Sequence, residues 1–337
     1  MKKFTYAMSG VDISLEEKAV EGILSAIRFR RKGIGEHIGG HYAGLINFGE
    51  HVLAFCIDGV GSKIMVANEM RKWDTIGIDC VAMNVNDCIC VGAEPIAFVD
   101  YLAMERTDPR IAEEIGKGLS RGAEMANISI VGGETATLPD MIRGMDLAGA
   151  CIGYAEKSKI VLGDKIMEGD VIIGLGSSGL HSNGYTLVRK ILKEKGFSYS
   201  YKLGKESLGD ILLTPTRIYV KEILELLKNV DVHGLAHITG GGIRNLMRLN
   251  KKVKFVISDP MEPQPIFYFI RKEGKVEWKE MFQTFNMGMG LAVIVPRDEK
   301  DDAISILEKN SEAEVKEVGY VDKGRGVDVK KFKLHYE

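Results

Sequence analysis

The chain has 337 residues, and at roughly 150 residues per domain this length favours two domains. It carries 45 Lys and Arg against 47 Asp and Glu, and the resulting net charge of −2 argues against a protein held on nucleic acid by phosphate neutralisation. Hydrophobic residues make up 45% and charged residues 27%, which is typical of a soluble globular protein. No apolar run approaches the roughly 20 residues that cross a membrane.

The cysteines and the N-terminus indicate a reducing compartment. Five cysteines do not make a disulfide scaffold in a chain of this length, and Ser9, Gly10 and Asp12 interrupt any apolar signal sequence. All five cysteines lie in apolar stretches, and Cys88-x-Cys90 is not a zinc spacing. We therefore expect a cytoplasmic protein with buried, free thiols.

The first half of the chain alternates apolar runs with glycine-rich turns. A basic cluster, Arg28–Lys32, precedes a glycine-rich stretch at 33–41 that predicts a mobile loop. Short apolar runs bounded by turn residues predict strands, and longer runs or an i, i+4 spacing predict helices. In chain order we expect a strand at 52–57, a helix at 75–91, a strand at 95–104, a helix beginning at Pro109, and strands at 128–131 and 146–154.

The chain turns polar between 163 and 170, and there we place a boundary between an N-terminal domain (1–165) and a C-terminal domain (166–337). Strands and helices interleave on both sides without a strict βαβ rhythm, which predicts a mixed α/β (α+β) fold. The second half is expected to contain strands at 170–173, 253–258, 290–295 and 315–321, and helices near 183–195, 217–228, 243–249, 264–272 and 300–309.

An acidic residue ends the first predicted strand. Asp58 opens the turn Asp58-Gly59-Val60-Gly61-Ser62-Lys63, where Gly59 and Gly61 would let a ligand approach the backbone and Lys63 would supply a positive charge. The spacing differs from that of a Walker A loop. A solvated turn is an equally good interpretation of the pattern alone.

The predicted helix at 75–91 contains Asp79, Asn84, Asn86 and Asp87 among apolar residues, and it has no Lys or Arg. Asp79 and Asn86 are seven residues apart and share a face. Because a buried carboxylate without a partner is costly, these groups need a remote cation, backbone donors or a metal. Their oxygens suit Mg²⁺. The alternative is structural capping and hydrogen bonding between helices.

Glu134 ends a third segment of this kind, after Gly132 and Gly133. Together with Asp58 and Asp87, it would fit a divalent-ion site for a polyphosphate. Two like charges 4 Å apart repel by about 4 kcal/mol at an effective dielectric of 20. A metal must therefore lie between the acids and the phosphates if this site binds a nucleotide.

Two glycine-rich segments in the second half are candidate anion sites. Gly174–Gly179 matches G-x-G-x-x-G, but no strand ending in an acid follows the next helix, so we reject a Rossmann site. The segment still offers an anion cradle, with His181 and Asn183 as polar donors. His237–Gly242 precedes a predicted helix and favours phosphate binding over a plain loop. His237 could instead be an ordinary polar core residue.

These motifs, in this order, resemble the phosphoribosylformylglycinamidine cyclo-ligase family, also called aminoimidazole ribonucleotide (AIR) synthetases, over nearly the whole chain. The residues that carry the resemblance are Ser9–Ile13, Asp58–Lys63, Ile76–Asp79, Val85–Asp87, Gly92–Pro95, Gly132–Thr135, Gly176–Tyr185, Pro215–Val220, His237–Gly242 and Met281–Gly290.

The resemblance implies a two-domain α/β subunit in a homodimer, in which the N-terminal sheets pair into a shared barrel and ATP lies in a cleft between the domains. It implies ATP-dependent cyclisation of formylglycinamidine ribonucleotide to aminoimidazole ribonucleotide, with release of ADP and phosphate, in de novo purine biosynthesis. Phosphorylation of an amide oxygen would make it a leaving group, and a nitrogen of the same molecule would then close the ring.

Site roles follow from the same resemblance. Mg²⁺ is expected at Asp58, Asp87 and Glu134. The nucleotide is expected at Asp58, Gly59, Gly61, Lys63, Asn86, Gly133, Thr239, Gly240 and Gly241, although the loop 237–242 could hold the substrate's phosphate instead. The expected catalytic residues are His181, Asn183 and His237. Leu24 stands where many members have a lysine, and the cluster Arg28–Lys32 could substitute for it.

Two kinds of alternative were weighed. A selenophosphate synthetase would need a reactive cysteine near its N-terminus, whereas the first cysteine here is Cys56. Formylglycinamidine synthase would be far longer, and thiamine-monophosphate kinase lacks a segment like Met281–Gly290. A nucleotide-binding regulatory subunit without turnover is a different class, and the presence of every acidic and glycine motif weighs against it.

Overall fold

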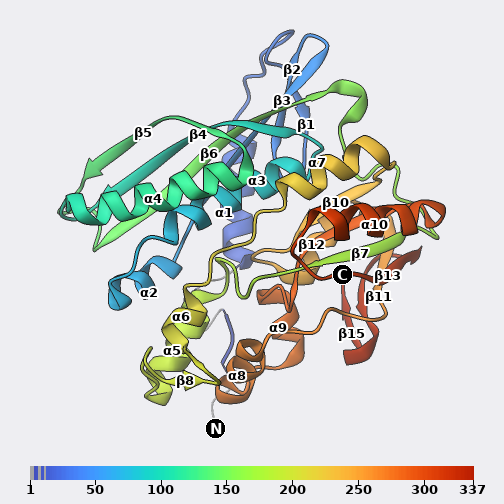
Figure 1. Ribbon diagram of the computed structural model, residues 1–337. Helices are drawn as coiled ribbons and strands as arrows, with labels where there is room; N and C mark the ends of the chain where they lie inside the picture. Colours follow the sequence, from blue (N-terminus) through green and yellow to red (C-terminus); the bar gives the residue numbers. More distant parts are fainter. Residues whose placement is uncertain (1–3, 7–8, 11–12) are drawn as a thin grey trace.

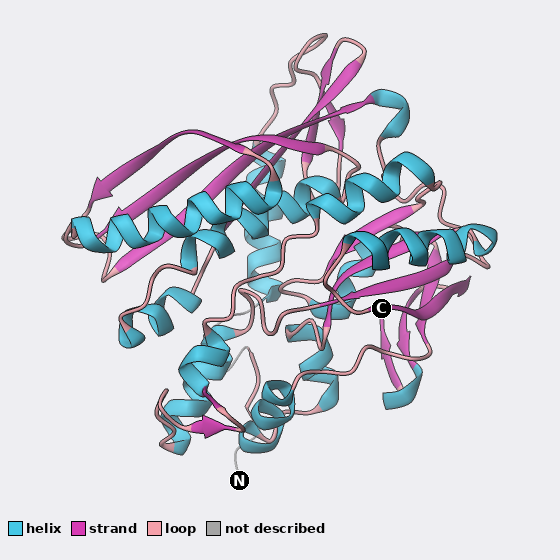
Figure 2. Cartoon of the chain, viewed as in Figure 1, coloured by secondary structure: helices cyan, strands magenta, loops and turns pink. Residues whose placement is uncertain are grey.

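The computed structural model describes residues 4–6, 9–10 and 13–337, which fold around two β-sheets (Figure 1). Val11 and Asp12, part of the first family motif, lie outside the described residues. Helices and strands interleave through both halves (Figure 2), which confirms the mixed α/β class. The chain passes from one sheet to the other through residues 157–170. The exact boundary at 165/166 stays a prediction.

The first sheet has six strands in the order β1-β2-β3-β6-β4-β5, in which only the β4–β5 pair among the described strands is parallel. The elements of this half are α1 (Ile13–Ala26), β1 (His37–Gly39), β2 (Gly44–Phe48), β3 (His51–Gly59), α2 (Lys63–Met70), α3 (Ile76–Ile89), β4 (Glu94–Met104), α4 (Pro109–Ala126), β5 (Ser129–Thr137), β6 (Met145–Glu156) and η2 (Lys157–Lys159).

The second sheet has seven strands in the order β10-β12-β7-β13-β11-β14-β15, and β8 and β9 form a separate pair. The strands are β7 (Val171–Gly176), β8 (Lys202–Leu203), β9 (Glu206–Ser207), β10 (Gly234–His237), β11 (Val253–Ile257), β12 (Met289–Val295), β13 (Val315–Lys323), β14 (Gly326–Val329) and β15 (Leu334–Tyr336). The helices are α5 (Tyr185–Lys195), α6 (Leu208–Leu212), α7 (Val220–Asn229), η3 (Gly242–Arg248), α8 (Pro265–Gly274), α9 (Trp278–Thr284), η4 (Arg297–Glu299), α10 (Lys300–Asn310) and η5 (Lys330–Phe332).

The longest apolar runs gave the most accurate predictions. The helix expected at 75–91 is α3, and the strand expected at 290–295 is β12, which is buried along its whole length. Two expectations need correction. The stretch 33–41 is not simply a mobile loop, because β1 pairs there with β2, and the helix expected at 243–249 is the short 3₁₀ helix η3. All five cysteines are buried and free, as expected.

The two faces of the first sheet differ sharply. Helices α3 and α4 cover one face (Figure 1), and Cys80 of α3 lies against Gly149 of β6. The other face leaves large apolar side chains exposed, and Ile57 is 81% exposed. We call this the outer face; its exposed apolar residues are Phe55, Ile57, Val99, Tyr101 and Tyr154.

In the part of the chain that the structure describes, no helix is long and apolar enough to cross a membrane.

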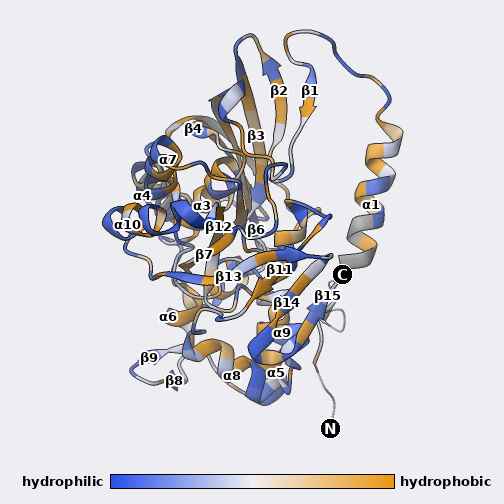
Figure 3. Ribbon diagram, turned by 90° about the vertical axis from the view of Figure 1, so that its right-hand side faces the viewer, coloured by the Kyte–Doolittle hydropathy of each residue, from blue (hydrophilic) through white to orange (hydrophobic). Residues whose placement is uncertain are grey.

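Helix α1 was not predicted, and it borders the molecule rather than joining its core. Figure 3 shows α1 standing beside the two sheets, with hydrophobic and hydrophilic residues along it. Val20, Ile23 and Leu24 on this helix are each more than half exposed. The described side chains of α1 therefore form no buried face in the single subunit.

Two glycines allow α3 and α4 to touch through their backbones. A Cβ atom on Gly77 of α3 would collide with the backbone of Ile115 and Leu119 in α4, and a Cβ on Gly118 would collide with the backbone of α3 and the turn before it. Gly116, also in α4, faces open space. The close contact fixes the position of α3, which carries several of the candidate site residues.

Gly77→Ala should lower the free energy of unfolding by about 2 kcal/mol, because a forced methyl group in a close-packed contact costs about 1–3 kcal/mol. Gly116→Ala is the matched control in α4. It should stabilise the protein by about 0.5–1 kcal/mol, because alanine is the better helix former. Urea denaturation measures both changes, and equal stability of the two variants would contradict the proposed contact.

Candidate active site

A cleft of about 950 Å³ lies between the two halves of the chain. One wall is the turn that follows β3, and the other is the segment that leads into α5 together with residues near η3; α1 contributes Val20 and Glu21 at the border. Five of the predicted site residues line this cleft: Asp58, Gly59, Gly61, Asn183 and Gly240. The cleft therefore joins motifs that are more than a hundred residues apart in the sequence.

Asp58, which lines the cleft, forms an acidic pair with Asp87, which does not line it. Asp58 comes from the end of β3 and Asp87 from the last turn of α3. Burial, and next the negative charge of Asp87, raise the pKa of Asp58 to about 6, while the Gly59 N–H, His237 and Arg248 act in the opposite direction. The two partly buried carboxylates repel each other, and a cation bound between them would relieve this repulsion.

His237 is fully buried and is hydrogen-bonded to this pair. Its Nδ1 lies 2.8 Å from Oδ1 of Asp87. An ionised Asp87 can only accept, so the proton is assigned to Nδ1 and Nε2 is left as an acceptor. Nε2 is buried and has no hydrogen-bond partner. The imidazole is thus held in one tautomer with a free lone pair.

Glu134 does not join the acidic pair within one subunit. The strand register places Asp58, Asp100 and Gly133 in one row across the sheet, and Gly59, Tyr101 and Glu134 in the next row. Adjacent rows face opposite sides of a sheet, and three strand spacings amount to about 14 Å. Glu134 is exposed on the outer face, whereas Asp58 faces the helices. Among the described residues, no three His, Cys, Asp or Glu side chains gather closely enough to hold a metal.

Lys63 and Asn86 have other partners than a nucleotide. Both are fully buried, and neither lines the cleft. The Lys63 ammonium pairs with Asp79, 2.8 Å from Oδ2, and donates to the carbonyl oxygens of His181 and Thr214. These contacts use the three N–H groups of the ammonium, so the expected contact with ATP phosphates does not agree with this geometry.

Asn86 connects α3 to the segment that precedes α7. Its Nδ2 donates to the carbonyl of Arg217, and its Oδ1 accepts from the Tyr219 N–H. Asp79, on the same face of α3, is satisfied by a remote cation and a backbone donor, Lys63 and the Thr216 N–H. The sequence analysis named a remote cation, backbone donors or a metal as possible partners of this carboxylate, and the structure provides the first two.

His181 lies behind the cleft rather than in it. It is 1% exposed and adopts a left-handed backbone conformation (φ 60°). Its Nε2 accepts the Ser178 N–H at 3.2 Å, and its Nδ1 is buried without a hydrogen-bond partner. Burial, and next the charge of His237, hold the pKa of His181 well below its usual range. The side chain is a neutral, structural part of the loop that presents Asn183.

The loop 237–242 needs its glycines for close approach. A Cβ on Gly240 would lie 3.0 Å from Oδ1 of Asn183, and Gly241 has φ +131° beside the side chain of Asn245. Asn245 in turn donates to the His237 carbonyl and to Oγ1 of Thr239. The following helix η3 has seven residues and is of the 3₁₀ type, so its dipole adds little to anion binding.

Two cations at the cleft were missed by the sequence analysis. Arg248 and Lys251 line it, and the guanidinium of Arg248 lies 5.3 Å from the ring centre of Tyr42. Ring contacts of this kind restrict an arginine side chain. In the sequence, the only feature that pointed to Arg248 was its position six residues after the last glycine of the loop. A basic residue at such a distance is too common to be singled out. The cluster Arg28–Lys32 is exposed and does not line the cleft.

Comparisons with known proteins agree with the fold and the motifs. Family models described as AIR synthase related protein, N-terminal domain and C-terminal domain, match residues 40–155 and 167–331. The phosphoribosylformylglycinamidine cyclo-ligase of Methanosarcina mazei is 56% identical over 310 residues, which are 90% of this chain and 92% of the relative. That of Pyrococcus furiosus is 49% identical over 338 residues, 98% of this chain and 99% of the relative.

A solved structure shares the whole fold. AaThiL complexed with AMPPCP and TMP aligns over 94% of this chain and 93% of its own, with a TM-score of 0.65 and 16% identity. The family expected from the motifs is confirmed by the two matched domain models and by the relatives in sequence. The chain belongs to the phosphoribosylformylglycinamidine cyclo-ligase (AIR synthetase) family.

Proposed function

We propose that this chain closes the imidazole ring of aminoimidazole ribonucleotide from formylglycinamidine ribonucleotide, using ATP and Mg²⁺ in the cleft and releasing ADP and phosphate. The observation that carries the proposal is the meeting of Asp58, Asn183 and Gly240 at one cleft between the two halves. Its volume of about 950 Å³ is at the upper end of the range for ligand sites, which suits two ligands side by side.

The acidic pair fits Mg²⁺. Carboxylate oxygens are the ligands this ion takes in proteins, usually one or two of them together with phosphates and water. The pKa of Asp58, raised by burial and by Asp87, supports the view that a cation belongs here. Bound Mg²⁺ would neutralise the charge between the two acids and the transferred phosphate. Glu134 is left out of this site because it lies on the other face of the sheet.

The residues of the chain then have separate tasks. Asn183 orients the amide that is phosphorylated, because its Nδ2 is buried at the cleft without a partner. His237 accepts a proton at Nε2, and Asp87 holds it in the required tautomer. Arg248 and Lys251, with the loop 239–241, hold a phosphate group. Since phosphoryl transfer depends mainly on positioning and charge, these tasks account for the first step.

Ring closure follows without another protein nucleophile. The phosphorylated oxygen is a good leaving group, and the attacking nitrogen belongs to the same molecule, so its effective concentration is high. The protein only has to keep the two ends of the substrate together and take up a proton. His237 is our candidate for the proton acceptor, through its unpartnered Nε2.

We further propose a cytoplasmic homodimer that pairs the outer faces of two subunits, with domains divided at 165/166. Support comes from the exposed apolar residues Ile57, Val99 and Tyr101, which share one face of the first sheet. Contiguous apolar surface of this kind usually marks an interface. Glu134 lies on the same face and would be covered in such a dimer.

The main test is an assay of the purified chain with ATP, Mg²⁺ and formylglycinamidine ribonucleotide, in which ADP and aminoimidazole ribonucleotide are measured together. Equal amounts of both products are expected. ADP without the cyclised product would indicate another substrate. Nucleotide binding without ADP release would indicate a regulatory protein.

Asp87→Asn should lower kcat by about 100-fold, because it removes one charge from the acidic pair and weakens the hold on the His237 tautomer. Its melting temperature should stay close to that of the parent, since Asn keeps the shape of the side chain. Asp298→Asn, at an exposed site in η4, is the control and should be fully active. Full activity of Asp87→Asn would rule out the assigned role.

Arg248→Met should raise the KM of one phosphate-bearing ligand by about tenfold, because hydrogen bonds to charged groups are the strong ones. Titration of ATP and of formylglycinamidine ribonucleotide in turn identifies which ligand Arg248 holds. Arg248→Lys should retain part of the affinity. Arg244→Met, in the same helix but away from the cleft, should change neither KM. If both KM values of Arg248→Met equal those of the parent, the phosphate site lies elsewhere.

Val99→Asp should convert the dimer to a monomer, because the new charge would be buried in an apolar interface without a partner. Met125→Asp places the same charge on exposed α4, on the opposite side of the sheet, and should leave the dimer intact. Light scattering after size-exclusion chromatography gives both masses. A monomeric parent protein, or a dimeric Val99→Asp variant, would refute the proposed interface.

A further inference from the structure

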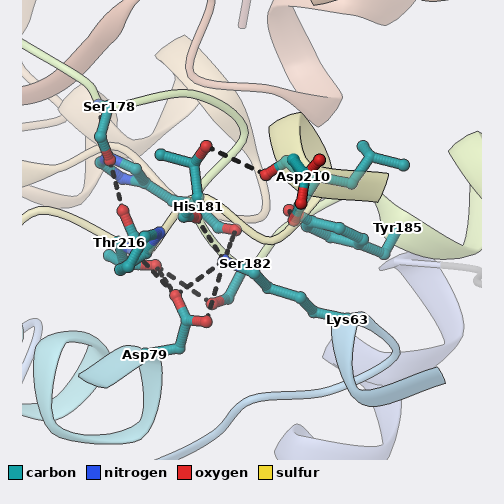
Figure 4. A network of polar contacts seen from close by, with 11 residues as sticks. Lys63, Asp79, Ser178, His181, Ser182, Tyr185, Asp210 and Thr216 are labelled. Atoms are coloured by element: carbon teal, nitrogen blue, oxygen red, sulfur yellow. Dashed lines mark hydrogen bonds and ion pairs between the residues drawn. The ribbon is translucent and has the colours of Figure 1, made fainter. Parts of the chain in front are cut away.

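Figure 4 shows a buried polar cluster that connects the two walls of the cleft and that no expected role explains. Its centre is Asp79, which pairs with Lys63 and accepts the Thr216 N–H and the Thr216 hydroxyl, both at 2.7 Å. Lys63 and Asp79 are fully buried, and Thr216 is 1% exposed. We call Lys63, Asp79 and Thr216 the clamp.

On one side, the clamp is joined to the turn 58–62. Lys63 is the residue directly after this turn and the first residue of α2. The turn supplies Asp58, Gly59 and Gly61 to the cleft. Any movement of the Lys63 backbone therefore moves this wall of the site.

On the other side, the clamp holds the loop 178–184. Lys63 donates to the His181 carbonyl at 3.2 Å, and the Thr216 hydroxyl is 3.1 Å from that of Ser182. Ser178 at the start of the loop donates its hydroxyl to the Pro215 carbonyl, next to Thr216. The loop supplies Ser182, Asn183 and Gly184 to the cleft, although no clamp residue lines it.

The loop needs such external support. His181 has φ 60°, a left-handed conformation that is unfavourable for residues with a side chain and persists only when the surroundings enforce it. Its carbonyl is bound by Lys63 and its Nε2 by the Ser178 N–H. The clamp thus keeps a strained turn in place directly before Asn183.

We propose that Lys63, Asp79 and Thr216 are positioning residues that set the loop 178–184 against the turn 58–62, so that Asn183 faces the ligand held at Asp58. The inference deepens the proposed function and rests on it for its catalytic consequence. The clamp itself never touches substrate. Its effect on the reaction passes through Asn183.

Thr216→Val tests the clamp because it removes only the hydroxyl that bonds Asp79 and Ser182. We expect kcat to fall about tenfold while the KM for ATP changes by less than about twofold, since misplacement by a fraction of an ångström affects the reacting geometry more than binding. Thr216→Ser retains the hydroxyl and should recover most of the loss. Thr284→Val is the matched control, because the Thr284 hydroxyl is equally buried and has no hydrogen-bond partner.

A double-mutant cycle with Asn183→Ala separates positioning from general destabilisation. If the clamp acts through Asn183, Thr216→Val should change kcat by less than about twofold once Asn183→Ala is present. Independent, multiplying effects would overturn the proposal. So would a kcat of Thr216→Val equal to that of the Thr284→Val control.

Hydrogen exchange of the ligand-free protein gives a readout that does not depend on the reaction. Amides of residues 178–184 should exchange about tenfold faster in Thr216→Val than in Thr284→Val. If the parent protein proves inactive but exchange increases, the proposed function fails and the positioning role stands. Unchanged exchange overturns the positioning role. If Thr216→Val does not fold, Ser178→Ala at the margin of the cluster replaces it. This variant should also increase the exchange rate of residues 178–184, by a smaller factor. Unchanged exchange in Ser178→Ala would overturn the positioning role.

Discussion

The arrangement of the whole site depends on one ion pair that is shielded from water. Removing an ammonium and a carboxylate from water costs several kcal/mol each, and only close pairing with further hydrogen bonds offsets that cost. Lys63 and Asp79 are both fully buried, and hydrogen bonds from Thr216 to Asp79 and from Lys63 to the carbonyls of His181 and Thr214 add to the ion pair. Those partners come from the second half of the chain. The pair is therefore satisfied only when the two halves are docked.

Helix α3 connects this structural pair to the chemical one. Asp79 in its first turn belongs to the clamp, Asn86 binds the segment before α7, and Asp87 in its last turn belongs to the acidic pair. The backbone contact through Gly77 fixes the helix against α4. Since one rigid helix carries all three polar residues, the position of Asp87 relative to the loop 178–184 is determined by interactions more than a helical turn away.

The sequence was informative where local pattern decides structure and misleading where distant partners decide it. Apolar runs predicted α3 and β12, and the family resemblance implied one site for Asp58, Asn183 and Gly240, which line the same cleft. Lys63 and Asn86 looked like ligand contacts because the backbone groups that they bind, such as the carbonyls of His181 and Arg217, lie more than a hundred residues away, which no local motif reveals.

Glu134 shows a second limit of the same kind. Asp58 and Glu134 each lie beside glycines in a strand segment, but the strand register sets the two carboxylates on opposite faces of the sheet. Register depends on pairing with β4 and β6, so it cannot be inferred from the segment alone. Helix α1 was also missed, and its residues Val20, Ile23 and Leu24 are exposed in the single subunit.

The bare outer face has a consequence for how the protein is made. A newly synthesised subunit displays Ile57 and its apolar neighbours, together with the free edge of β5, until something covers them. The proposed dimerisation and non-specific aggregation would both depend on collisions between such subunits, so they would compete while translation is fast. Yield in a heterologous host should therefore improve with slower expression or lower temperature, even though the folded cores of the individual subunits are complete.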